Sequence, residues 1–216
     1  MSITDRLLKL NSELPSNVKL VAVSKYQPIE KLIEAYNSGQ RVFAESRPQE
    51  FLSKVSQLPN DVEWHFIGHL QTNKLKMVLP NVSLLHSVDS LRLLESIQKW
   101  AVANNKVISV LLELHIATED TKQGFTSNEI LSIISQRNQY PNIVFKGLMA
   151  MASFTDDQAL IRTEFNTIQN LYNRIKSENS DIENFKELSI GMSSDYQLAI
   201  SSGSTMVRIG SYIFND

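Results

Sequence analysis

The sequence predicts a single-domain (β/α)8 barrel that spans residues 1–216. Short apolar runs alternate with amphipathic segments along the whole chain, and this alternation indicates parallel strands joined by helical crossovers. The chain is long enough to form one α/β core. An open, doubly wound sheet is the alternative, but Ser24-Lys25-Tyr26-Gln27-Pro28 follows the first strand in place of a glycine-rich dinucleotide-binding turn.

The predicted elements follow from hydrophobic spacing and from helix-breaking residues. The first strand covers 19–25, because its short apolar run is too brief for a helix and Pro28 follows. An extra helix precedes it, opened by Ser2 or Thr4 and ended by Pro15. The later strands are predicted at 41–45, 63–68, 82–87, 107–116, 145–150, 188–191 and 205–210. The helices between them are predicted at 29–39, 48–58, 72–79, 90–104, 156–178 and 194–202. One further helix begins after the fifth strand with Ser127 as its N-cap, and the loop before it contains Glu119, Asp120 and Lys122.

Composition excludes several classes of protein. The chain has 21 basic and 23 acidic residues without a block of like charge, so we expect neither a nucleic acid nor a membrane surface as its main partner. It has no cysteine, which excludes disulfides and thiolate metal sites. Charged residues interrupt the leucines of residues 1–14, so no signal peptide is predicted, and no apolar run approaches the roughly 20 residues that span a bilayer. We expect a cytoplasmic protein.

Lys25 is the first candidate site residue, at the C-terminal end of the first strand. Reactive groups of a (β/α)8 barrel lie at this end of the strands. A lysine held at the mouth of an apolar strand presents an amine that can act as a nucleophile toward an aldehyde. The alternative is a lysine that extends from the strand end into solvent.

The loops after the last two strands predict a site for phosphate. Gly191-Met192-Ser193-Ser194-Asp195 follows the seventh strand, and Gly210-Ser211 follows the eighth. Phosphate groups are commonly held by these two loops of a barrel, although ordinary helix capping would also explain the serines. Both loops together favour a phosphate-binding cradle.

Arg208 lies within the predicted eighth strand, and a buried guanidinium must be paired or must contact a ligand. A salt bridge to Glu45, at the end of the second strand, would satisfy it without a ligand. Together, the amine, the cradle and the arginine suit an aldehyde that carries a phosphate. Pyridoxal 5′-phosphate fits this description best, because its ring nitrogen needs a partner.

Several longer motifs point to a known family. They are Val21-Ala22-Val23-Ser24-Lys25, Trp64-His65-Phe66-Ile67-Gly68-His69-Leu70-Gln71-Thr72-Asn73-Lys74, Gly147-Leu148-Met149-Ala150-Met151, Leu188-Ser189-Ile190-Gly191-Met192-Ser193-Ser194-Asp195 and Arg208-Ile209-Gly210. With these motifs in this order, the chain resembles the YggS/PROSC family of pyridoxal 5′-phosphate homeostasis proteins from its first strand to its last turn.

The resemblance implies a single barrel of the alanine racemase N-terminal type that binds pyridoxal 5′-phosphate as a Schiff base on Lys25. It also implies that Arg208 faces the pyridine nitrogen, where a permanent cation disfavours a second positive charge. The remaining residues are assigned by the same resemblance: Ser193, Ser194, Gly210 and Ser211 around the phosphate, and Met149, Ser46 and His65 in the pocket wall.

The chain departs from the family pattern at two places beside this site. Phe43-Ala44-Glu45-Ser46 stands where the family has Phe-Gly-Glu-Asn, so a contact made by that asparagine is in doubt. Glu113-Leu114-His115 stands where the family has Gln-Val-Asn. A carboxylate in place of an amide would change the charge balance of the pocket.

The implied function is non-catalytic: the protein, as a monomer, buffers pyridoxal 5′-phosphate and delivers it to apoenzymes. A racemase is the alternative, and it would need a second acid or base such as Tyr196 or Tyr212 opposite Lys25. A Schiff-base aldolase also suits a lysine with a phosphate site, but it predicts no bound chromophore. No metal site is expected, because a strand end separates His65 from His69.

Overall fold

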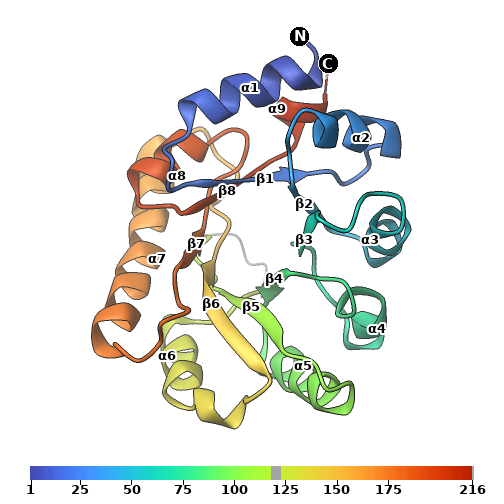
Figure 1. The fold of residues 1–216 in the computed structure, drawn as a ribbon. Helices are drawn as coiled ribbons and strands as arrows, with labels where there is room; N and C mark the ends of the chain where they lie inside the picture. The colour runs from blue at the N-terminus through green and yellow to red at the C-terminus, as the bar shows by residue number, and fades with distance from the viewer. Residues whose placement is uncertain (118–122, 216) are drawn as a thin grey trace.

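The computed structural model describes residues 1–117 and 123–215. In this part of the chain, eight parallel strands close into a barrel in the order β1 to β8, and helices surround it (Figure 1). The predicted fold is therefore confirmed. Glu119, Asp120 and Lys122 of the predicted loop lie outside the described residues.

Strands and helices alternate as the sequence predicts. The strands are β1 Lys19–Val23, β2 Val42–Glu45, β3 Glu63–Phe66, β4 Leu84–Val88, β5 Ile108–Glu113, β6 Ile143–Met149, β7 Glu187–Ser189 and β8 Met206–Ile209. The α-helices are α1 Ile3–Glu13, α2 Ile29–Asn37, α3 Pro48–Val55, α4 Leu75–Val78, α5 Leu91–Ala103, α6 Ser127–Ser135, α7 Gln158–Glu178, α8 Tyr196–Ser201 and α9 Ser211–Phe214. Short 3₁₀ turns occur at Thr72–Lys74 and Arg137–Gln139.

One predicted helix cap is wrong, and one short helix was not predicted. Thr126, not Ser127, caps α6, because its hydroxyl accepts the Glu129 N–H while the Glu129 carboxylate accepts the Thr126 N–H. The sequence also gave no sign of α9. This last turn packs beside α1, where the Arg6 guanidinium donates to the carbonyl oxygens of Ile213 and Asn215, so the two ends of the chain lie together (Figure 1).

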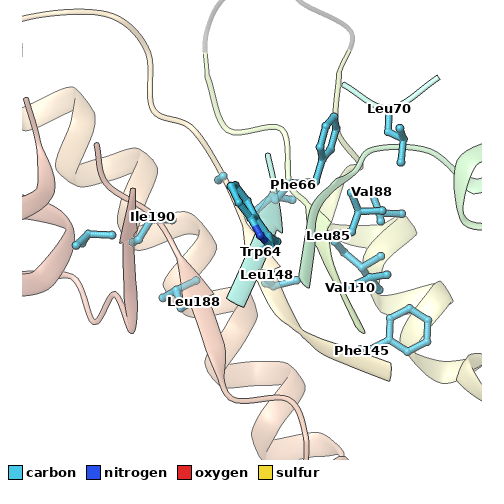
Figure 2. Close-up of a cluster of buried hydrophobic side chains, with 14 of the residues drawn as sticks. Trp64, Phe66, Leu70, Leu85, Val88, Val110, Phe145, Leu148, Leu188 and Ile190 are labelled. Atoms are coloured by element: carbon cyan, nitrogen blue, oxygen red, sulfur yellow. The ribbon is translucent and has the colours of Figure 1, made fainter. Parts of the chain in front are cut away.

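The hydrophobic core has two layers, because successive residues of a strand point to opposite faces. Leu20 and Ala22 of β1 belong to the large cluster between strands and helices, part of which Figure 2 shows. Val21 and Val23 belong to a small separate cluster inside the barrel, together with Ala44, Leu84, Leu111, Met149 and Met206. The barrel interior also holds buried polar side chains, and these build the site described below.

Gly147 occupies a position that excludes any side chain. Its φ is +152°, and a Cβ atom would lie 1.7 Å from the carbonyl oxygen of Glu187 on β7. The register between β5 and β6 shifts just before it. We expect Gly147→Ala to lower the free energy of unfolding by about 2 kcal/mol, since β6 and β7 must separate. Urea denaturation measures this, and Gly39→Ala is the control because its φ is also positive but nothing lies within 4 Å of the added Cβ.

Among the described residues, none of the helices combines the length and the apolar character needed to cross a bilayer.

Candidate functional site

The site lies where β1 and β8 pair at the C-terminal mouth of the barrel. Val21 lies opposite Arg208 in this pair, and Lys25 follows β1 by two residues. Lys25 is exposed, and its amine has no hydrogen bond or ion pair within the described part of the chain. Tyr26, next to it, has a φ of 63° and donates its N–H to Glu50 at 2.9 Å. The tight turn therefore presents the lysine amine to solvent at the mouth.

The loops after β7 and β8 meet beside this turn. The Gly210 N–H points to the Ser193 hydroxyl oxygen at 3.4 Å. A Cβ atom on Gly210 would lie 2.8 Å from the Val23 carbonyl oxygen, so only glycine allows the loop to approach β1 this closely. Ser194 and Ser211 are exposed on the same two loops. The structure thus brings the four predicted phosphate residues to one corner of the mouth, next to Lys25.

Arg208 is 4% exposed, and its guanidinium contacts backbone and hydroxyl oxygens rather than a carboxylate. Nη1 donates to the carbonyl oxygen and to Oγ of Ser189, each at 2.7 Å, and Nη2 donates to the Ala150 carbonyl oxygen at 3.0 Å. The Nε–H and the second Nη2–H have no acceptor among the described residues. Burial lowers the pKa of Arg208 to about 10, so the group is a cation at neutral pH.

The salt bridge between Arg208 and Glu45 that the sequence left open does not form. Glu45 is completely buried and contacts Lys54, whose Nζ lies 2.7 Å from its Oε1, and it accepts the Ser24 hydroxyl at 2.6 Å. Lys54 also donates to the Ser24 carbonyl oxygen at 2.8 Å. This cluster fixes Ser24, the residue before Lys25, so it supports the turn that carries the amine.

His65 lies inside the barrel and is completely buried, so it can reach a ligand only through other side chains. Its Nδ1 lies 2.9 Å from Nε2 of His86, and its Nε2 lies 2.9 Å from Glu63 Oε1. His86 in turn contacts Ser189 Oγ at 3.1 Å. Burial lowers the pKa of both histidines, which favours neutral rings.

The other two predicted pocket residues, Met149 and Ser46, lie at the ends of strands β6 and β2, and His115 lies just after β5. Met149, 1% exposed, ends β6 and pairs in register with Glu113, the last residue of β5. Ser46 follows β2, and its backbone approaches Gly68 so closely that a Cβ there would lie 2.0 Å from the Ser46 oxygen. His115 is exposed and contacts the Gln123 carbonyl oxygen at 3.1 Å. Met149 and Ser46 therefore border the mouth, whereas His115 faces solvent.

Glu113 is 6% exposed and has no side-chain hydrogen bond within the described residues. Burial, with a smaller contribution from Asp89, raises its pKa to about 7. The Arg208 cation opposes this shift. A carboxyl group at this departure from the family pattern therefore titrates near neutral pH beside the mouth.

Sequence reasoning missed Ser189 and His86, which connect Arg208 to the barrel interior. Ser189 lies between Leu188 and Ile190, and His86 lies in β4 after Leu84 and Leu85. An inward-facing polar side chain at such a position needs a buried partner, and this was the available signal. His65 and His69 are separated as predicted, because His69 is exposed and pairs with Asp89 at 2.8 Å.

The comparisons with known proteins agree with this geometry. The family model described as the N-terminal domain of alanine racemase matches residues 2–216. A protein of Aquifex aeolicus named pyridoxal phosphate homeostasis protein is 38% identical over 92% of this chain and 86% of its own. A Synechocystis protein of the same name is 38% identical over 94% and 93%. The chain belongs to the pyridoxal phosphate homeostasis protein family.

Solved structures agree with this family and with the fold. PipY of Synechococcus elongatus, with PLP bound, is 32% identical and has a TM-score of 0.91 over 99% of this chain and all of its own. The same protein without PLP has a TM-score of 0.93. An alanine racemase of Clostridium difficile is only 15% identical, with a TM-score of 0.77, and this chain covers 56% of it. The racemase shares the fold alone.

Proposed function

We propose that the protein binds pyridoxal 5′-phosphate at the barrel mouth, through a Schiff base on Lys25, and serves to store and deliver this cofactor. The observation that carries the proposal is the buried Arg208 cation, which keeps two N–H groups unpaired within the described residues, on a strand that pairs with β1 before Lys25 and leads into the small-residue cradle. The residues fit the cofactor, since an aldehyde, a ring nitrogen and a phosphate each find a matching group. The family relatives and PLP-bound PipY support the same ligand.

Each residue has a distinct task in this proposal. The exposed Lys25 amine would hold the cofactor through its aldehyde carbon, with the aldehyde oxygen released as water. Ser193, Ser194, Gly210 and Ser211 offer hydroxyl and backbone N–H donors to the phosphate. Arg208 would donate to the ring nitrogen and, as a cation at neutral pH, would disfavour its protonation. The bound cofactor supplies an electron-withdrawing ring, and keeping its nitrogen unprotonated weakens that capacity, which suits storage better than catalysis.

A racemase would need a second acid or base opposite Lys25. The Tyr196 hydroxyl lies 3.0 Å from a carboxylate oxygen of Glu13, the last residue of α1. Tyr212 packs against the large core cluster. Neither placement supports the racemase alternative. Transfer to apoenzymes, the monomeric state, the cytoplasmic location and the single-domain boundary stay predictions.

The test is covalent labelling of the purified protein. After addition of pyridoxal 5′-phosphate, the parent protein should show a visible absorption band, and borohydride reduction should add the cofactor mass to the peptide containing Lys25. Lys25→Ala should fold normally, because an exposed side chain contributes no core volume, and it should lose the label. Lys99→Ala removes another exposed lysine, far along the chain on α5, and should keep it.

Two results would contradict the proposal. A colourless parent protein that takes up no cofactor would favour the aldolase alternative. Cofactor mass on a lysine other than Lys25 would leave binding in place but would refute the assigned attachment site.

A further inference from the structure

A continuous row of polar side chains crosses the barrel interior from Arg208 to the opposite end. It passes from Arg208 through Ser189, His86 and His65 to Glu63, with successive distances of 2.7, 3.1, 2.9 and 2.9 Å. The three middle side chains, Ser189, His86 and His65, are completely buried. Glu63 is partly exposed at the first residue of β3 and pairs with Lys19 at 3.2 Å. The proposed function uses only the first member of this row.

The two ends of the row fix the direction of every hydrogen bond in it. A guanidinium can only donate, and an ionised carboxylate can only accept. The hydrogen bond from His65 holds the pKa of Glu63 at about 2, so Glu63 is ionised at neutral pH. His65 must therefore donate from Nε2, and as a neutral ring it accepts at Nδ1 from Nε2 of His86. His86 then accepts at Nδ1 from the Ser189 hydroxyl, which itself accepts from Arg208.

We infer that Ser189, His86, His65 and Glu63 form a one-directional hydrogen-bond chain that holds the Arg208 guanidinium in place at the cofactor site. This inference rests on the proposed function, and it makes His86, His65 and Glu63 positioning residues. Each link donates away from Arg208, so the acceptor end of each dipole faces the cation and the donor end faces the Glu63 anion. The acceptor at Glu63 thereby fixes the direction of the hydrogen bonds that hold the Arg208 guanidinium at the other end of the barrel.

The chain itself is tested without cofactor, by ¹⁵N NMR of the histidine rings in the apoprotein at neutral pH. The expected result is that His65 and His86 are both neutral and both carry their proton on Nε2. A doubly protonated His65, or an Nδ1 proton on either ring, would overturn the assigned direction. This measurement does not depend on whether the proposed function is correct.

The effect on the site is tested by the dissociation constant for pyridoxal 5′-phosphate. His86→Phe keeps a ring of similar size but breaks the chain, and it should weaken binding roughly tenfold. Glu63→Ala removes the terminal acceptor and should weaken binding about threefold to tenfold. Glu63→Gln restores an acceptor oxygen for His65 and should bind within about twofold of the parent.

Asp61→Asn is the matched control, because it removes a carboxylate two residues away that pairs with Arg41 and has no contact with His65. It should bind the cofactor as the parent does. Equal affinity of folded His86→Phe, Glu63→Ala and parent would overturn the inference, even though the parent binds the cofactor. A parent that binds none would instead refute the proposed function, and with it the effect of the chain on the cofactor.

Discussion

Lys54→Met is expected to lower the free energy of unfolding by about 3–5 kcal/mol, because it breaks a buried ion pair from one side. Lys54 is 7% exposed and Glu45 is completely buried, with 2.7 Å between Nζ and Oε1. The other carboxylate oxygen of Glu45 has no partner in the described structure. Burial already raises the pKa of Glu45, and its hydrogen bond with Lys54 is the largest effect that opposes this shift. Without Lys54, the carboxylate keeps only the Ser24 hydroxyl as a side-chain partner.

Urea denaturation at pH 7 measures this loss, with Lys99→Met as the control for replacing an exposed helical lysine. The double variant Glu45→Gln/Lys54→Met should recover most of the lost stability, because it removes the uncompensated buried charge. The single variant should also loosen the turn that carries Lys25, since Lys54 holds the Ser24 carbonyl. A loss below about 1 kcal/mol in Lys54→Met would contradict this account.

Glu113→Gln is expected to stabilise the protein by about 3 kcal/mol above pH 8 and to have little effect at pH 4. Burial raises the pKa of Glu113 to about 7, whereas the unfolded chain has its ordinary value near 4.5. Between these values the folded protein holds a proton that the unfolded chain has lost. Stability therefore falls as the pH rises through this window, and the full cost is present above pH 7. A neutral amide removes the cost.

Urea denaturation of parent and variant at several pH values between 4 and 8.5 measures this difference, and Glu95→Gln on the exposed face of α5 is the control. The difference between parent and Glu113→Gln should grow with pH, while the control should follow the parent. A pH-independent difference would show that Glu113 is ionised throughout or that the amide acts through packing.

The order of strands and helices could be predicted because each element carries a local signal. Pro15 and Pro80 follow helices, Gly39 follows α2, and the apolar runs are short enough to be strands. Element boundaries were less accurate: several strands are shorter than predicted, since the last residues of each run leave the ladder to form loops. The turn α9 has no strong helical pattern of its own, and its hydrogen bonds with Arg6 come from the other end of the chain.

The sequence predicted which residues form the site but not which side chains contact one another. Lys25, Arg208 and the two small-residue loops follow strand ends, so sequence position alone brings them to the mouth. The sequence left Glu45 open as a partner of Arg208, but Ser189 and Glu45 lie on opposite faces of the barrel wall: Ala44 belongs to the inner cluster, so its neighbour Glu45 points outward to the helices. Outside the barrel, α3 supplies Lys54 as the partner of Glu45, while inside it the arginine contacts Ser189.

The sequence by itself determined the alternation of strands and helices, and hence the barrel and the end at which its reactive groups gather. Those features depend on the spacing of apolar and helix-breaking residues along the chain, and this spacing can be recognised in the sequence itself. The tertiary structure alone decided which buried charges neutralise one another and that Glu63, His86 and Arg208 form one row. The contact between His86 and Ser189 joins residues 103 positions apart, and its formation depends on the three-dimensional register of the closed sheet.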